Sequence, residues 1–350
     1  MRPGTASPLT PDVFTERVSA IRGWLIFFWL CLKLVRHRLL PGTPLPDFVP
    51  HKDALARVAH SLFRWRRLRV VNPNLCPADG SAIFVANHHG LDDPALLWPA
   101  IHLASGERFI PRFLMRDDFF RGFPWDWLPI RLNTLCERCG AVPISRGRIS
   151  PAQLRPALQS LKEGNACALF PGGTRSRTGA WIEYRPGEEN THGDPAALAA
   201  LAARVAGKPE IPVIPMGITR HPILRQVTVA FGSPIRVASR GDASELAARN
   251  QEICHAIGLL TEVHAVHLVA AIIWALCTHH RKSFPLKTVV HAVMDWAASP
   301  PCPLVHPELI REPESACRRA CAYFARLGYL RIAGREIYPR ESRVNNCPPW

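Results

Sequence analysis

The chain has 350 residues, of which 47% are hydrophobic and 20% are charged, so it is long and apolar enough to bury a large core. Its formal net charge of +15 favours a polyanionic partner: nucleic acid, an anionic membrane surface or a phosphorylated substrate. The eleven cysteines are odd in number and scattered, which argues against a disulfide framework and favours a reducing compartment. Cys136 and Cys139 have no second pair at zinc spacing, so we expect no metal site there.

Residues 1–50 are predicted to contain an unstructured start, a membrane-associating helix and a linker. The helix is expected over residues 21–35, an apolar stretch rich in Trp and Phe with basic residues at its flanks. A helix of that length spans about 22 Å at about 1.5 Å per residue, less than the roughly 30 Å hydrocarbon core of a bilayer. The pattern favours a helix lying in one leaflet. A buried packing helix and a tilted span that starts near Val18 are the alternatives.

Residues 51–241 alternate short apolar runs with helical patterns. Strands are predicted over residues 82–86, 108–115, 140–146, 165–170, 211–218 and 226–231, and helices over residues 54–70, 95–103, 151–163 and 196–206. This alternation predicts an α/β domain with a mostly parallel central sheet flanked by helices. In such sheets ligands bind at the carboxyl ends of the strands.

The first polar cluster follows the predicted strand at residues 82–86. Asp93 lies five residues after His88, where its carboxylate can accept the Nδ1 proton of the imidazole, fix the tautomer and stabilise the imidazolium. The Nε2 lone pair then faces a substrate hydroxyl, as a general base requires. His89 and Asp92 could take the same two roles, and Asp93 could instead cap the helix that follows.

Two further polar clusters also follow predicted strands. Arg146 ends one strand, and another runs into a turn rich in glycine and arginine at residues 171–179. Consecutive glycines let backbone N–H groups point at an anion, which Arg175 or Arg177 can bind with two hydrogen bonds. A surface hairpin turn is the alternative reading. Three such clusters at one sheet edge predict a binding site there.

Residues 242–350 change character and are predicted to form a helical C-terminal extension that ends in a hairpin. Helices are expected over residues 243–257, 263–277, 286–298 and 312–327, and the hairpin over residues 329–338. Helices followed by a two-stranded wing resemble a winged-helix-like module, which with the positive charge invites a non-enzymatic nucleic-acid-binding role. That role leaves the three polar clusters unexplained, so we expect no nucleic-acid partner.

With these clusters established, the sequence resembles the glycerolipid O-acyltransferases that carry an N-H-x-x-x-x-D motif, the family of lysophosphatidate (1-acylglycerol-3-phosphate) acyltransferases. Asn87-His88 with Asp93 matches that motif. The family's second, third and fourth motifs are similar to the segments at residues 140–146, 170–176 and 213–216. All four occur in the family's order, while residues 242–350 lie outside the resemblance.

The resemblance implies a membrane-associated enzyme on the cytoplasmic face, acting in phospholipid biosynthesis. It would move a fatty acyl group from acyl-CoA or acyl carrier protein to the hydroxyl of a lysophospholipid acceptor such as lysophosphatidate. Glycerol-3-phosphate or a lyso-aminolipid is the alternative acceptor, and no metal or redox cofactor is implied. His88 and Asp93 would form the catalytic pair, and the substrate-binding residues would be Arg146, Gly173, Thr174, Arg175 and Ser176.

Two positions depart from the family pattern. Gly172 stands where the third motif usually has a glutamate, and Gly90 stands where the first motif usually has a serine. The missing glutamate removes a carboxylate beside the expected anion site. It motivates the rival reading of a catalytically silent, membrane-bound scaffold. Neither departure touches the expected His/Asp pair.

Overall fold

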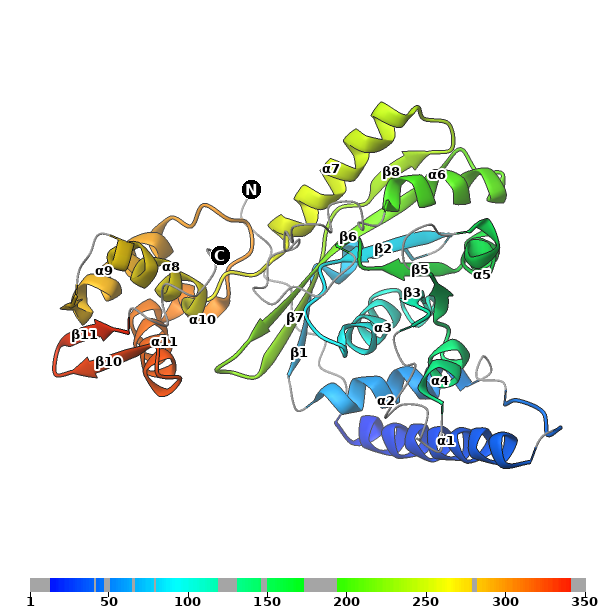
Figure 1. The fold of residues 1–350 in the computed structure, drawn as a ribbon, viewed down its shortest axis with the longest axis horizontal. Coiled ribbons are helices and arrows are strands. Elements are labelled where there is room, and N and C mark those ends of the chain that lie inside the picture. Colours follow the sequence, from blue (N-terminus) through cyan, green and yellow to red (C-terminus); the bar gives the residue numbers. More distant parts are fainter. Residues whose placement is uncertain are drawn as a thin grey trace.

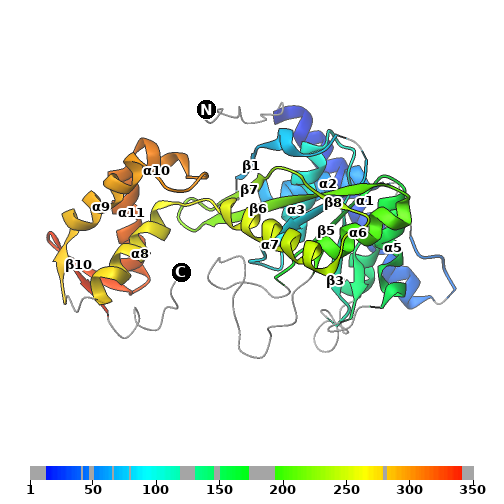
Figure 2. The same cartoon turned by 90° about the horizontal axis from the view of Figure 1, so that it is seen from above.

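The computed structural model describes residues 13–40, 42–46, 51–64, 67–78, 80–118, 131–145, 150–172, 194–278 and 282–340. A large sheet lies between layers of helices, and a smaller module of helices with a short sheet follows it in the chain (Figures 1 and 2). The strands of the large sheet in the described residues are β1 (Leu68–Val71), β2 (Ala82–Ala86), β3 (Arg112–Arg116), β4 (Val142–Ile144), β5 (Ala166–Leu169), β6 (Glu210–His221), β7 (Gln226–Phe231) and β8 (Ile235–Ala238).

The strand order is β1-β7-β6-β2-β5-β3-β4, and β8 also pairs with β6. The five strands from β6 to β4 run parallel to their neighbours, whereas β7 and β8 run antiparallel to β6 and β1 runs parallel to β7. The predicted mostly parallel sheet is therefore confirmed. Because β2, β5 and β6 are parallel neighbours, the residues that follow them meet at one edge.

Helices cover both faces of the sheet, which is why β2 reads as an unbroken apolar run. On one face, Ile83 and Val85 pack with α5 (Pro151–Lys162), α6 (Pro195–Ala206) and α7 (Ala243–Leu259). On the other face, Phe84 packs against α3 (Asp93–Ala104). Figure 1 shows this helix beside the sheet. Successive side chains of a strand point to opposite faces, so one short apolar segment contributes to both cores.

Two predicted boundaries are wrong. The helix expected to reach residue 70 ends earlier, as α2 (Lys52–Arg64), and β1 occupies the end of the predicted range. The β-branched pair Val70-Val71 favours a strand, and β1 pairs with β7, which lies far along the sequence. The strand expected from residue 108 begins only at Arg112, because Pro111 has no backbone N–H to donate to a neighbour. The short helix α4 (Leu132–Arg138) was not predicted.

The N-terminal helix α1 (Val13–Leu39) has one packed side and one exposed apolar side. It packs on α2 through a small cluster that includes Leu30, Leu34 and Leu55. On its other side, four large apolar residues are each 58–68% exposed: Ile21, Leu25, Phe28 and Leu32. Basic residues occupy its last turn. Among the described residues, no helix combines the length and apolar character needed to cross a bilayer.

The C-terminal module has a core of its own. It consists of α8 (Ala265–Thr278), β9 (Phe284–Pro285), α9 (Leu286–Ala298), α10 (Pro307–Arg311), α11 (Pro313–Arg326), β10 (Leu330–Ala333) and β11 (Glu336–Pro339). β10 and β11 form the hairpin, and β11 also pairs with β9. The helix α7, which the sequence grouped with this extension, packs Ile253 and Ile257 into the core of the large sheet. The module therefore begins after α7.

Buried polar contacts join the module to the sheet. Glu262, which is 1% exposed, accepts hydrogen bonds from Arg69 and from the Thr228 hydroxyl, the latter at 2.7 Å. The Glu262 backbone N–H donates to the Thr219 hydroxyl at 2.8 Å. Gly217 permits this close approach, since an added Cβ would collide with the Leu260 carbonyl. The segment between α7 and α8 is thus held against the end of β6.

Four histidine rings form a column at the same junction. The ring centroids of His306, His221, His264 and His267 lie 4.9, 4.5 and 3.7 Å apart in that order. Burial, together with the charge of neighbouring imidazoles, lowers the pKa of His264 and lowers that of His267 to about 4. Both rings are therefore neutral at neutral pH.

Acidification is expected to destabilise the fold through these rings. An unfolded histidine has a pKa near about 6.5, so the unfolded chain takes up protons that folded His264 and His267 do not. The stabilising contribution of the neutral rings to the free energy of unfolding is complete above a pH of about 6.5. For His267 it is lost as the pH falls toward about 4. Urea unfolding between pH 7.5 and 4.5 should show a shallower decline for His267→Gln than for the wild type. Exposed His255→Gln is the control, and an unchanged decline in His267→Gln would contradict the assignment.

Candidate active site

Asn87 fixes the backbone at the end of β2. Its side chain is 1% exposed and makes two hydrogen bonds with the backbone of Ile218 in β6. Asn87 Nδ2 donates to the Ile218 carbonyl at 2.9 Å, and the Ile218 N–H donates to Asn87 Oδ1 at 2.7 Å. Because a buried amide with satisfied bonds holds its position firmly, the next residue leaves the sheet in a defined direction.

His88 and Asp93 form the pair that the sequence predicted. His88 Nδ1 lies 2.7 Å from Asp93 Oδ2, and the same oxygen accepts the N–H groups of His89 at 2.6 Å and Gly90 at 2.8 Å. Asp93 is fully buried at the start of α3. Bonding to a carboxylate places the His88 proton on Nδ1 and leaves the Nε2 lone pair available, as a base for a substrate hydroxyl requires.

The buried Asp93 carboxylate stays charged. Burial by itself would raise its pKa, but the hydrogen bond from His88 and the charge of Arg220 outweigh that effect, so its pKa lies below its ordinary value. Asp93 is also not the helix cap, because Asp92 occupies the N-cap position of α3. A charged carboxylate on Nδ1 favours the imidazolium that forms when Nε2 takes a proton.

Arg220, at the end of β6, is a site residue that the sequence analysis missed. Its guanidinium donates to Asp93 Oδ1 from Nη2, and it binds both oxygens of Asp92, at 2.8 Å from Nη2 and 3.1 Å from Nη1. Burial would lower the pKa of Arg220, but the two aspartates raise it overall. The available signal was an arginine at the end of a strand that was expected to lie parallel to β2.

The structure also separates the predicted pair from its two neighbours. Asp92 faces Arg220, and the His89 ring lies with Nε2 2.6 Å from the Asn87 amide nitrogen. Burial lowers the pKa of His89, which keeps that ring neutral. His89 therefore contacts Asn87, and Asp92 binds Arg220. The histidine and aspartate that bond to each other are His88 and Asp93.

The departure at Gly90 has a structural reason. A Cβ at this position would lie 2.6 Å from Asp92 Oδ1 and 3.0 Å from Arg220 Nη2. Both distances are shorter than ordinary van der Waals contact. A serine here would have to displace the ion pair between Asp92 and Arg220. The position of the Arg220 guanidinium therefore requires a glycine at residue 90.

The β5 side of the site brings Phe170, the first residue of the predicted third motif, to His88. Val85 and Leu169 are paired in register, so β2 and β5 end at the same edge. Phe170 stacks on the His88 ring, with centroids 4.2 Å apart and planes 16° apart. The described chain continues to Gly172. The predicted binding residues beyond it, Gly173, Thr174, Arg175 and Ser176, lie outside the described residues, as does Arg146.

Comparison with known proteins gives a family match and a structural match. A family model described as Acyltransferase matches residues 67–219, from the segment before β1 to the end of β6. The match assigns an acyltransferase domain to residues 67–219 of the 350-residue chain. A solved structure with similarity to the chain is the 1-acyl-sn-glycerophosphate (LPA) acyltransferase PlsC from Thermotoga maritima, at 18% identity and a TM-score of 0.40, covering 69% of this chain and 93% of that one. No curated protein matches the chain.

The family match thereby confirms the predicted likeness to the acyltransferases over residues 67–219, and the His88–Asp93 pair lies inside the matched segment. Arg220 is the first residue after it. Everything that follows, including α7 and the C-terminal module, lies outside the match. The matched segment thus contains the contact between His88 and Asp93, while its contacts with the module come from elements at its border.

The potential metal ligands in the described residues do not include His88 or Asp93. Three ligand atoms, from His221, His306 and Glu308, fall within 4.8 Å of one another at the junction with the module. Gln226 already bonds His306 at 3.1 Å, and Arg319 bonds Glu308. Burial raises the pKa of Cys136 to about 11 and that of Cys139 to about 12, so both are neutral thiols at neutral pH.

Proposed function

We propose that this acyltransferase moves a fatty acyl group from a thioester, acyl-CoA or acyl carrier protein, to the hydroxyl of a lysophospholipid-type acceptor such as lysophosphatidate. The observation that carries the proposal is the His88 Nδ1–Asp93 contact at the carboxyl edge of the sheet, beside the end of β5. A base held in this way suits deprotonation of an alcohol. The residues that follow β5 in the sequence suit binding of the acceptor's phosphate.

In the proposed mechanism, His88 Nε2 takes the proton of the acceptor hydroxyl as its oxygen attacks the thioester carbonyl carbon. The tetrahedral intermediate collapses with cleavage of the C–S bond, and the imidazolium returns its proton to the departing thiolate. Asp93 stabilises the imidazolium, and Arg220 keeps the Asp93 carboxylate charged and oriented. Arg146 and the segment from Gly173 to Ser176 hold the acceptor phosphate.

We further propose that the protein works at an anionic membrane surface on its cytoplasmic face. The exposed apolar side of α1 and the basic last turn of that helix support this placement, as does the net charge of +15. Flotation with vesicles that contain anionic lipid should recover the protein, and high salt should weaken the recovery. Equal recovery with uncharged vesicles at every salt concentration would reject the electrostatic part of this placement.

The decisive experiment for the function is a panel of acceptors offered with one labelled acyl thioester. Lysophosphatidate, glycerol-3-phosphate and lyso-aminolipids should be compared by product formation and thiol release. Preferred acylation of a lysophospholipid supports the proposal, and preferred acylation of glycerol-3-phosphate would replace it. Absence of transfer to every acceptor, with membrane binding retained, would favour a catalytically silent scaffold.

Arg175→Ala tests the proposed phosphate contact. The substitution removes a charge-assisted hydrogen bond of about 1.5–3 kcal/mol, so the KM for a phosphate-bearing acceptor should rise by roughly 10- to 100-fold. The KM for the thioester should change little. Exposed Arg236→Ala provides a matched loss of one positive charge, far from the sheet edge that holds His88. An unchanged acceptor KM in Arg175→Ala would tell against this role.

A further inference from the structure

The end of β6 carries the counter-charge of the catalytic pair. Arg220 points toward the start of α3, where it binds Asp93, and Asp93 in turn binds His88. The neighbouring side chain of Thr219 points to the opposite face of the sheet, because successive residues of a strand alternate between the two faces. A displacement of this strand end would therefore move the cation that keeps the buried Asp93 charged.

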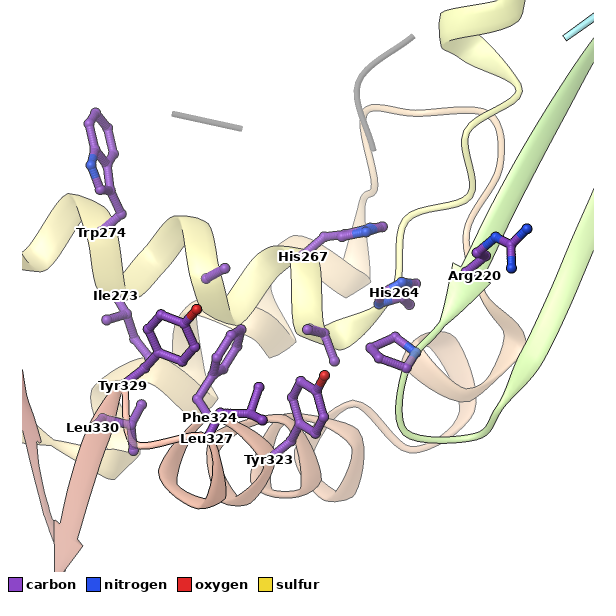
Figure 3. Close-up of a pocket in the computed structure, with 13 residues that line it drawn as sticks. Arg220, His264, His267, Ile273, Trp274, Tyr323, Phe324, Leu327, Tyr329 and Leu330 are labelled. Carbon is purple, nitrogen blue, oxygen red and sulfur yellow. The ribbon is translucent and has the colours of Figure 1, made fainter. Parts of the chain in front are cut away.

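Side-chain packing holds Arg220 only in part. A cavity of about 310 Å³ borders it, between the sheet and the C-terminal module, and Figure 3 shows Arg220 and His264 on the walls of this cavity. The Nε–H of Arg220 has no hydrogen-bond partner among the described residues. The position of the guanidinium thus depends on its contacts with Asp92 and Asp93 and on the backbone of β6.

Glu262 holds this backbone from the face opposite Arg220. Its N–H donates to the Thr219 hydroxyl oxygen at 2.8 Å, and the two residues are 1% and 4% exposed, respectively. Its carboxylate accepts hydrogen bonds from Arg69 on β1 and from Thr228 on β7. A buried N–H that loses its acceptor is costly, so the bond to Thr219 constrains both partners. One residue therefore ties the end of β6 to two other strands of the sheet.

The C-terminal module holds Glu262 in turn, through the next residue. The Val263 N–H donates to the Leu304 carbonyl at 3.0 Å, and the Val263 carbonyl accepts the His306 N–H at 2.8 Å. These bonds join the segment before α8 to the segment before α10, and both segments lie outside the family match. The position of Glu262 is therefore fixed jointly by the sheet and by the module.

We propose that Glu262 is a positioning residue for the His88–Asp93 pair, so that acyl transfer depends on the docking of the C-terminal module against the end of β6. This assignment rests on the proposed function. Glu262 touches no substrate in this scheme, since it holds Thr219 while the adjacent Arg220 keeps Asp93 charged. A misplaced counter-charge slows the chemical step without weakening substrate binding, so the loss should appear in kcat and not in KM.

The first test removes the hydroxyl that Glu262 holds. Thr219→Val keeps the shape of the side chain, and kcat for acyl transfer should fall by about five- to tenfold while the KM for both substrates changes less than about twofold. Thr219→Ser keeps the hydroxyl and should restore kcat.

Ser105→Ala is the matched control. Ser105 is also 4% exposed, and its hydroxyl oxygen accepts the Phe109 N–H at 3.0 Å at the far end of α3. Ser105→Ala and Thr219→Val should both lower the unfolding temperature, but only Thr219→Val should lower kcat. Wild-type kcat in Thr219→Val, or an equal fall of kcat in Ser105→Ala, would overturn the proposal.

The second test needs no turnover. The proton between His88 Nδ1 and Asp93 should give a far-downfield proton NMR resonance, identified by its absence from His88→Ala. Thr219→Val should shift this resonance, as should Glu262→Gln, which weakens the anchoring of Glu262 to β1 and β7, whereas Ser105→Ala should not. An unchanged resonance in both variants of an active enzyme would reject only the positioning role. A shifted resonance in a protein whose wild type transfers no acyl group would reject only the proposed reaction.

Discussion

Replacing His88 with alanine is expected to lower kcat for acyl transfer by about 10²- to 10⁴-fold, the usual contribution of a positioned general base. The substitution removes the only nitrogen that the His/Asp pair presents to a substrate hydroxyl, since Nδ1 is bonded to the buried Asp93. The fold should persist, because the His88 side chain is partly exposed and the Asp93 carboxylate keeps its bonds from two backbone N–H groups and from Arg220.

The measurement is single-turnover product formation from a labelled thioester, together with thermal unfolding of the same preparation. His255→Ala removes an exposed imidazole from α7 and serves as the matched control, with wild-type activity expected. Normal activity of a folded His88→Ala protein would reject the assigned base. Loss of the unfolding transition together with activity would be uninformative for the alanine variant, so His88→Asn, which keeps a polar group of similar size, should be measured beside it.

Arg220→Met is expected to have the largest effect on stability. Breaking a buried ion pair by removal of one partner costs about 3–5 kcal/mol, and because a quarter of the Arg220 side chain is exposed we expect a value of about 3 kcal/mol. The fully buried Asp93 would lose its counter-charge and its pKa would rise. Its stabilising contribution would then be lost at a higher pH as the solution is acidified. Activity should fall as well, since the imidazolium of His88 would face a less firmly charged carboxylate.

Urea unfolding of a double-mutant cycle tests this explanation. Combining Arg220→Met with Asp93→Asn removes both charges, so stability should recover part of the loss while activity stays low. Arg236→Met is the control, because Arg236 pairs with Glu210 on the surface and such pairs contribute about 0–1 kcal/mol. If Arg220→Met lost no more stability than the Arg236→Met control, the contacts of Arg220 would not stabilise the buried Asp93 carboxylate.

The sequence alone located the features that depend on neighbours along the chain. The apolar run of β2, the proline at the start of α3 and the spacing between His88 and Asp93 are local, so a pattern in one segment predicts them. The alternation of strands and helices likewise predicted the parallel sheet and the shared edge at which β2 and β5 end. Even so, the local pattern predicts the end of a helix where β1 lies, because the pairing partner of β1 lies more than a hundred residues away.

Only the tertiary structure decided the roles of residues that meet across the chain. Arg220 reaches Asp93 from a strand 127 positions further on, and nothing local distinguishes it from the many other arginines. The same holds for Gly90, whose missing side chain leaves room for that arginine, and for the cavity, which exists only where α8 and α11 meet the end of β6. A local pattern specifies backbone geometry and the identity of a base, whereas charge pairing and cavity shape depend on which distant surfaces the fold brings together.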